Sequence, residues 1–266
     1  MKKYYESLVL FFFIALGVAG MDKGFAKSTQ EIAREILQEA SRRDDGFGDM
    51  TADVTMVLKY FGGEQYIRHL RVKNLEIEAD GEKRLFAFSQ PKDIKGTTIL
   101  IFGHIHDEDE QWIYLPAFKR VKRISSANKS GAFVSSEFAY EDLTSIEVDK
   151  YQHNYLGDTV FDGRDCFKLE LIPRYVNSGY SRQIAYIDKQ DYQFRQVQFF
   201  DLAGALLKTL VLQDYQQYEQ RYWRPALATM SNHQNNNVTV MQWDNIHLQT
   251  GLSSADFNRN AIKRFR

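Results

Sequence analysis

A two-residue alternation of apolar and polar side chains constrains the fold of this chain more than any other feature of its sequence. In residues 51–58 apolar side chains occupy every second position, and the same alternation returns in residues 167–171 and 196–199. Such a pattern places one face of a strand in a core and the other in water, which is typical of antiparallel sheets. The sequence therefore predicts a mainly β fold.

Short hairpins are expected to connect the strands. Asp80-Gly81 is a strong hairpin signal between the strand-like residues 75–79 and 83–88. Further strands are predicted at 97–105, 111–115, 145–156, 165–173, 182–188, 195–201, 206–214, 224–232 and 238–248. About eleven strands in one curved antiparallel sheet must close or be covered, because free edges invite aggregation. We expect a single domain that forms an unclosed β-barrel with a helical lid.

Three segments outside this alternation are candidates to cover the sheet. Residues 28–43 predict a helix, since Ser28 and Glu31 have the spacing of a capping box. Residues 125–143 predict a loop with a short helix near Ser135, and residues 253–265 predict a short closing helix. A covered, curved sheet encloses an apolar interior that either side chains or a ligand can fill. The residues leave both alternatives open.

The first 26 residues have the pattern of a secretory signal peptide. Two lysines precede the apolar residues 8–19, a run shorter than the roughly 20 residues of a membrane helix. Gly24-Phe25-Ala26 suits cleavage by signal peptidase. We therefore predict removal of residues 1–26 and export of residues 27–266 to the periplasm as a soluble domain. Cys166 is the only cysteine, which excludes an intramolecular disulfide and acylation near the cut.

Composition and motifs argue against several other functions. A formal net charge of −1 argues against a broad basic surface for nucleic acid. The sequence contains no nucleophile elbow, phosphate-binding glycine loop or zinc-protease motif, so we predict that it is not an enzyme. His104 and His106 precede the acidic residues 107–110, but acids are common in hairpin turns for local reasons. We expect no metal and no cofactor.

Five motifs follow one another in the middle of the chain, at residues 93–97, 111–117, 119–124, 131–138 and 140–143. They read DIKGT, QWIYLPA, KRVKRI, GAFVSSEF and YEDL. In this order they resemble the outer-membrane lipoprotein-sorting protein family, the exported relatives of the LolA and LolB carriers. Where that family usually has Gly-Ser-Asp-Phe, this chain has residues 135–138 as Ser-Ser-Glu-Phe, and the lost glycine alters what the turn tolerates.

The resemblance implies an open barrel with an apolar cavity and a lid. The implied activity is to carry the acyl chains of a lipoprotein, or another lipid, between membranes. The implied partners are an inner-membrane exporter and an outer-membrane acceptor. The alternative is an exported envelope module that recognises a protein or a polysaccharide without lipid transport.

The candidate site residues come from the same middle region. Those predicted to line the lipid cleft or its lid are apolar or aromatic: Trp112, Tyr114, Leu115, Pro116, Phe118, Phe133, Phe138 and Tyr140. Ordinary core packing is the alternative for them. Those predicted to contact a headgroup or a partner are Arg120, Lys122 and Arg123, for which a solvated strand face is the alternative. On a strand, Arg120 and Lys122 would share one face while Lys119 and Arg123 share the other.

Overall fold

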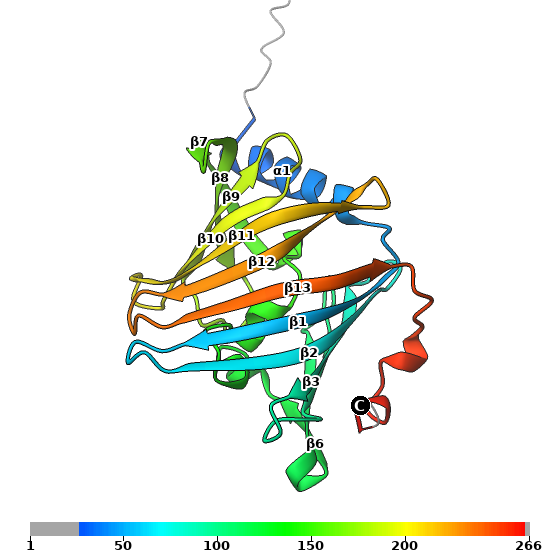
Figure 1. Cartoon of the computed structure of the whole chain (residues 1–266). Helices are drawn as coiled ribbons and strands as arrows, with labels where there is room; N and C mark the ends of the chain where they lie inside the picture. Colours follow the sequence, from blue (N-terminus) through cyan, green and yellow to red (C-terminus); the bar gives the residue numbers. More distant parts are fainter. Residues whose placement is uncertain (1–26, 264–266) are drawn as a thin grey trace, which may run out of the picture.

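The computed structural model describes residues 27–263, which form one long helix and a sheet of thirteen strands (Figure 1). The helix α1 spans Thr29–Asp44, and the capping box predicted at Ser28 is present. The strands are β1 (Asp49–Lys59), β2 (Gln65–Glu76), β3 (Glu82–Gln90), β4 (Thr98–Phe102), β5 (Glu110–Leu115), β6 (Arg120–Ile124), β7 (Tyr151–Phe161), β8 (Arg164–Pro173), β9 (Arg182–Asp188), β10 (Phe194–Phe200), β11 (Leu206–Tyr218), β12 (Tyr222–Asn232) and β13 (Val238–Leu248).

The strands form one antiparallel meander that does not close on itself. The order is β6-β5-β4-β3-β2-β1-β13-β12-β11-β10-β9-β8-β7, with β1 paired to β13. The two edges are therefore β6 and β7, which follow one another in the sequence and are joined by residues 125–150. We call residues 125–150 the cover. The predicted unclosed barrel is confirmed.

Some elements differ from the expectation. The sheet has thirteen strands rather than about eleven, and β6 is formed by the basic run, which lacks a clear apolar alternation. The strand predicted from residue 145 begins only at Tyr151, because Val148–Lys150 form a 3-10 turn. In place of a short closing helix, residues 253–263 contain two 3-10 turns, Ser254–Asp256 and Ala261–Lys263.

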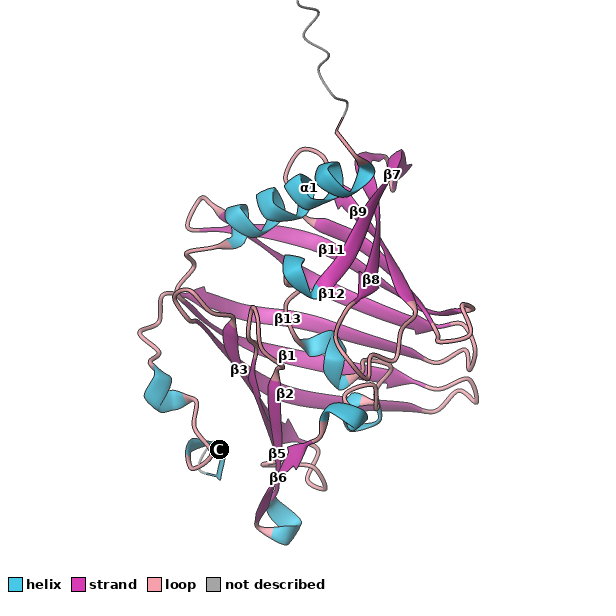
Figure 2. Cartoon of the chain, turned by 180° about the vertical axis from the view of Figure 1, so that it is seen from behind, coloured by secondary structure: helices cyan, strands magenta, loops and turns pink. Residues whose placement is uncertain are grey.

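The concave side of the sheet is occupied by the chain itself. Figure 2 shows α1 and the helical turns of the cover on the side toward which the sheet curves. Ile36 and Leu37 of α1 join Phe133 and Phe138 of the cover in one buried cluster with inward-facing residues of the strands. Of the two alternatives that the sequence left open, the structure has the interior filled by side chains.

The convex side carries a second, smaller core. Phe257 and Ile262 pack against Leu85, Leu100 and Trp112, which belong to β3, β4 and β5. We call residues 249–263 the C-terminal cap. This cap was expected among the segments that cover the mouth, but it lies on the opposite face from the cover. The strand β3 is therefore buried on both faces, which explains its nearly continuous apolar run.

Within residues 27–263 the structure has no helix that combines the length and apolarity needed to cross a bilayer. The predicted signal peptide, residues 1–26, lies outside the described residues.

Candidate functional site: the cover of the concave face

The cover is held in an irregular path by short turns. It contains 3-10 turns at Ser126–Asn128, Phe133–Ser135 and Tyr140–Leu143. The backbone amide of Phe133 donates to the carbonyl oxygen of Phe138 at 2.7 Å, which closes a small loop. Both side chains belong to the buried concave cluster, and Phe133 is completely buried. Its ring centroid lies 5.7–5.9 Å from those of Phe86, Phe88 and Tyr140, as in ordinary aromatic packing.

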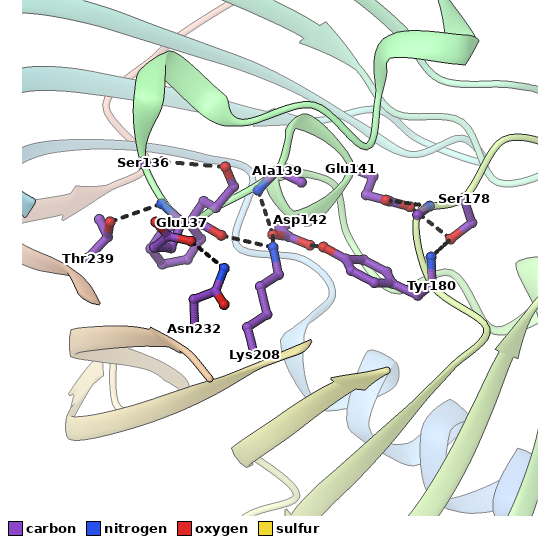
Figure 3. A network of polar contacts seen from close by, with 12 residues as sticks. Ser136, Glu137, Ala139, Glu141, Asp142, Ser178, Tyr180, Lys208, Asn232 and Thr239 are labelled. Atoms are coloured by element: carbon purple, nitrogen blue, oxygen red, sulfur yellow. Dashed lines mark hydrogen bonds and ion pairs between the residues drawn. The ribbon is translucent and has the colours of Figure 1, made fainter. Parts of the chain in front are cut away.

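A buried ion pair fixes the cover to β11. The ammonium of Lys208 lies 2.6 Å from a carboxylate oxygen of Asp142, and the two side chains are only 5% and 2% exposed. Figure 3 shows Lys208 reaching between Asp142 and Glu137, whose carbonyl oxygen accepts a second hydrogen bond from it at 2.9 Å. Asp142 also accepts from the hydroxyl of Tyr180 and from the amide of Ala139, each at 2.7 Å. Each charge of the pair is thus held by more than one hydrogen bond, as the burial of a charge requires.

The neighbouring Glu141 fixes the cover to the loop between β8 and β9. Its carboxylate accepts hydrogen bonds from the Gly179 amide at 2.8 Å, the Ser178 hydroxyl at 2.9 Å and the Tyr175 hydroxyl at 3.2 Å. Burial raises the pKa of Glu141 above its usual value, and the charge of Asp142 acts in the same direction. The three hydrogen bonds oppose this shift, because they stabilise the ionised form.

A third acidic residue, Glu137, joins the cover to the hairpin between β12 and β13. Its carboxylate accepts from the side-chain amides of Asn232 at 2.7 Å and Asn237 at 3.0 Å. Its backbone amide donates to the hydroxyl of Thr239 at 3.0 Å. These contacts, with those of Asp142 and Glu141, anchor one flank of the cover to elements between β8 and β13.

The other flank is anchored through backbone carbonyls of the cover. The hydroxyl of Tyr60 donates to Ser135 at 3.0 Å, and Gln111 donates to Tyr140 at 3.0 Å. Arg84 donates to Leu143 at 2.8 Å. Polar contacts therefore tie both flanks to the sheet, while the side facing inward is apolar. None of its residues belongs to the thirteen-stranded sheet, so no strand pairing of the sheet holds the cover in place.

The predicted cleft and lid residues lie in three places. Phe133, Phe138 and Tyr140 come together in the cover, in or against the concave cluster. Trp112 and Tyr114 lie on the convex face with the C-terminal cap. Leu115 ends β5, and Pro116 and Phe118 lie in the turn that follows it. The sequence could not place these groups, because alternation shows which residues share a face but not which face is concave.

The predicted cationic contacts obey strand geometry. Paired residues on neighbouring strands lie on the same face of the sheet. Arg120 and Lys122 of β6 pair with Leu115 and Ile113 of β5, on the concave face. Arg123 pairs with Trp112, on the convex face. Arg123 lies 3.0 Å from Glu110. The structure thus puts Arg120 and Lys122 at the sheet edge that borders the cover, with both side chains exposed.

Sequence reasoning did not select the polar anchors as site residues. A signal for one of them was available, because Lys208 interrupts the alternating apolar positions Leu206, Leu210 and Leu212. A lysine at such a position must find a buried partner. Its partner Asp142 lies 66 residues away in sequence and could not be inferred from spacing.

Among residues 27–263 no group of three or more His, Cys, Asp or Glu side chains is arranged to hold a metal ion. His104 instead lies 2.7 Å from a carboxylate oxygen of Asp80. A cavity of about 10 Å³ adjoins Ser145 of the cover, and a hollow of about 530 Å³ on the convex face is lined in part by Arg71 and His247.

Comparisons with known proteins identify the family. A family model described as an uncharacterized protein matches residues 80–264. An outer membrane lipoprotein-sorting protein domain from Vibrio parahaemolyticus is 49% identical, with a TM-score of 0.87 over 88% of this chain and 100% of that one. A DUF1329 family protein from Desulfovibrio piger is 25% identical, with a TM-score of 0.83 over 89% and 100%.

A LolA superfamily protein from Nitrosomonas europaea is 18% identical, with a TM-score of 0.69 over 88% of this chain and 99% of that one, and supports the fold alone. A search of curated proteins found no match. The fold is LolA-like. The chain belongs to the outer membrane lipoprotein-sorting protein family, as its ordered motifs predicted.

Proposed function

We propose that this chain is a periplasmic carrier that shields the acyl chains of a lipoprotein, or another lipid, on the concave side of its sheet. The main support is the construction of the cover. Its inward side is apolar, its flanks are tied by polar contacts, and it contributes no strand to the sheet. The 49% identity to a lipoprotein-sorting domain supports the same function.

The energetics favour an exchange between the cover and the ligand. An acyl chain in water loses about 0.8 kcal/mol of stabilisation for each exposed methylene. When the cover moves aside, the apolar surface that Phe133 and Phe138 leave can be buried again by acyl chains. Opening the cover also separates Lys208 from Asp142. This separation costs more than the exposed apolar surface, because a buried charge that loses its partner is strongly destabilising. Ligand binding and cover opening are therefore coupled.

The proposal assigns roles to the candidate residues according to their positions. Leu115, Phe133, Phe138 and Tyr140 contact acyl chains, and Arg120 and Lys122 contact the headgroup from the exposed edge of β6. Ligand binding by Trp112, Tyr114, Pro116, Phe118 and Arg123 stays a prediction from the sequence, and the first two lie on the other face.

The setting follows from the predicted leader. With residues 1–26 removed, the domain of residues 27–266 travels in the periplasm between an exporter in the inner membrane and an acceptor in the outer membrane. Shielding by burial requires no catalytic group, metal or cofactor. We therefore propose carriage without catalysis.

A binding experiment tests the proposal directly. Purified protein is mixed with a triacylated lipopeptide in detergent, the detergent is removed, and the protein is isolated by gel filtration. Extraction into organic solvent and mass spectrometry should then find lipopeptide in stoichiometric amount. A lipid-free extract from folded protein would contradict the proposal. Binding of a polysaccharide or a protein in its place would favour an envelope recognition module.

A further inference from the structure

One hairpin tip combines an exposed aromatic side chain with unpaired cations. The turn between β5 and β6 carries Phe118 at its apex, where 69% of the residue is exposed. Gly96, in the loop between β3 and β4, packs against the ring of Pro116 in this turn. Both connections leave the sheet at the same end, since β5 and β3 run in the same direction in the meander. Residues 91–97 and 116–122 therefore form one surface, which we call the β5–β6 apex.

The apex is strongly cationic. Its five basic residues are all exposed, and they are Lys92, Lys95, Lys119, Arg120 and Lys122. None of them forms an ion pair with another residue among 27–263. The one acidic residue in the two loops is Asp93, whose charge acts on Arg68. Five cations against one carboxylate leave a strong local positive potential beside an exposed phenyl ring.

We propose that the β5–β6 apex docks on an anionic lipid bilayer. An aromatic side chain at a protruding tip inserts at the level of the headgroups, and lysines and arginines around it contact lipid phosphates. Protection of the β6 edge against aggregation explains cations on β6 itself, but it does not explain Lys92 and Lys95, which lie in another loop. Docking in this orientation places the edge of the sheet that borders the cover next to the membrane.

This inference builds on the proposed carrier function, because a carrier must meet donor and acceptor membranes. The chain also supplies a matched control. Phe61, at the tip of the hairpin between β1 and β2, is even more exposed at 78%. That hairpin has a balanced charge from Lys59 and Glu64. The β1–β2 hairpin therefore has a more exposed aromatic side chain than the apex, but it lacks the surrounding cations.

The test is co-sedimentation of the protein with vesicles of phosphatidylcholine and phosphatidylglycerol, and with vesicles of phosphatidylcholine alone. We expect binding to the anionic vesicles that weakens as salt is added. Phe118→Ser should reduce it, and Phe61→Ser should leave it unchanged. Replacing Lys92 and Lys119 together by Gln should lower the partition coefficient about 30-fold, which corresponds to about 1 kcal/mol for each cation.

Equal binding to both vesicle types, or an unchanged partition for Phe118→Ser, would overturn the inference. Binding that depends on the cations but not on Phe118 would point to an acidic protein surface and would also overturn it. The lipopeptide binding assay in solution separates this result from the carrier proposal. The variant with Gln at Lys92 and Lys119 should keep full lipopeptide binding, because neither lysine is assigned to the carried lipid. A wild-type protein that docks on vesicles but binds no lipopeptide would contradict the carrier proposal and leave the docking inference standing.

Discussion

The cover and the C-terminal cap occupy opposite faces of the same sheet, and they are held there by different forces. Both bury an aromatic residue completely or almost so, Phe133 in the cover and Phe257 in the cap. The ion pair of the cover is buried, whereas the pair of the cap, Lys73 with Asp256, has side chains 22% and 34% exposed. A cap held mainly by apolar packing stays in place through many small contacts. The cover combines apolar packing with a few buried, directional polar contacts.

The largest expected effect concerns the two aromatic residues. Phe133→Ala and Phe257→Ala should each lower the free energy of unfolding by about 3–5 kcal/mol, since each leaves a cavity in a packed core. Urea unfolding measures both. Lipopeptide uptake separates the two variants. It should fall in Phe133→Ala, because Phe133 is assigned to contact acyl chains, and stay at the wild-type level in Phe257→Ala. Equal changes in uptake would show that the two faces do not differ in function.

The ion pairs provide the next contrast. Asp142→Asn should cost about 3 kcal/mol, because it leaves the buried ammonium of Lys208 without its counter-charge. Asp256→Asn on the cap should cost about 1 kcal/mol, since that pair is partly solvated. Chemical denaturation at neutral pH gives both values. A loss from Asp256→Asn as large as that from Asp142→Asn would contradict the account.

A double variant checks that the charge, rather than the shape, causes this loss. Asp142→Leu combined with Lys208→Met removes both charges and should be more stable than Asp142→Asn alone, because no unpaired charge remains buried. A double variant less stable than the single one would show that the surrounding hydrogen bonds dominate.

The smallest expected effect is a dependence on pH through Glu141. Burial raises the pKa of this carboxyl in the folded chain above the usual 4.5. The folded chain therefore binds this proton more tightly than the unfolded chain does. The stability that Glu141 contributes is fully present below the unfolded-state pKa and is lost as pH rises through the folded-state pKa. The stability of the wild type relative to Glu141→Gln should increase as pH falls from neutral to below 4.5. A difference that is flat or falls over this range would contradict the assignment.

The sequence predicted the parts of the fold that local rules determine. The capping box at Ser28 begins α1, and strict alternation identified strands such as β8 and β10, because a sheet buried on one face requires it. The short strand β6 was missed, because its charged residues mask the alternation. The burial of Trp112 beneath the cap depends on which face the C-terminal residues choose, and no local pattern contains that information.

Of the residues that form the cover, the sequence analysis selected only aromatic ones as candidates. Phe133 and Phe138 were selected because aromatic residues in an irregular segment suggest a lid, and both lie in the cover. The polar anchors were not selected, because each joins elements far apart in the sequence. The contact between Asp142 and Tyr180, for example, exists only because the cover crosses toward the start of β9.

Hydrogen exchange with and without an acyl ligand tests the central claim most directly. The amides of Phe133, Tyr140 and Glu141 donate hydrogen bonds within the cover and are protected while it is closed. When lipopeptide is bound, peptides from residues 125–150 should exchange faster, while peptides from residues 249–263 and from the sheet keep their rates. Unchanged or slower exchange in the cover of a lipopeptide-bound protein would contradict the claim that acyl chains replace it on the concave face.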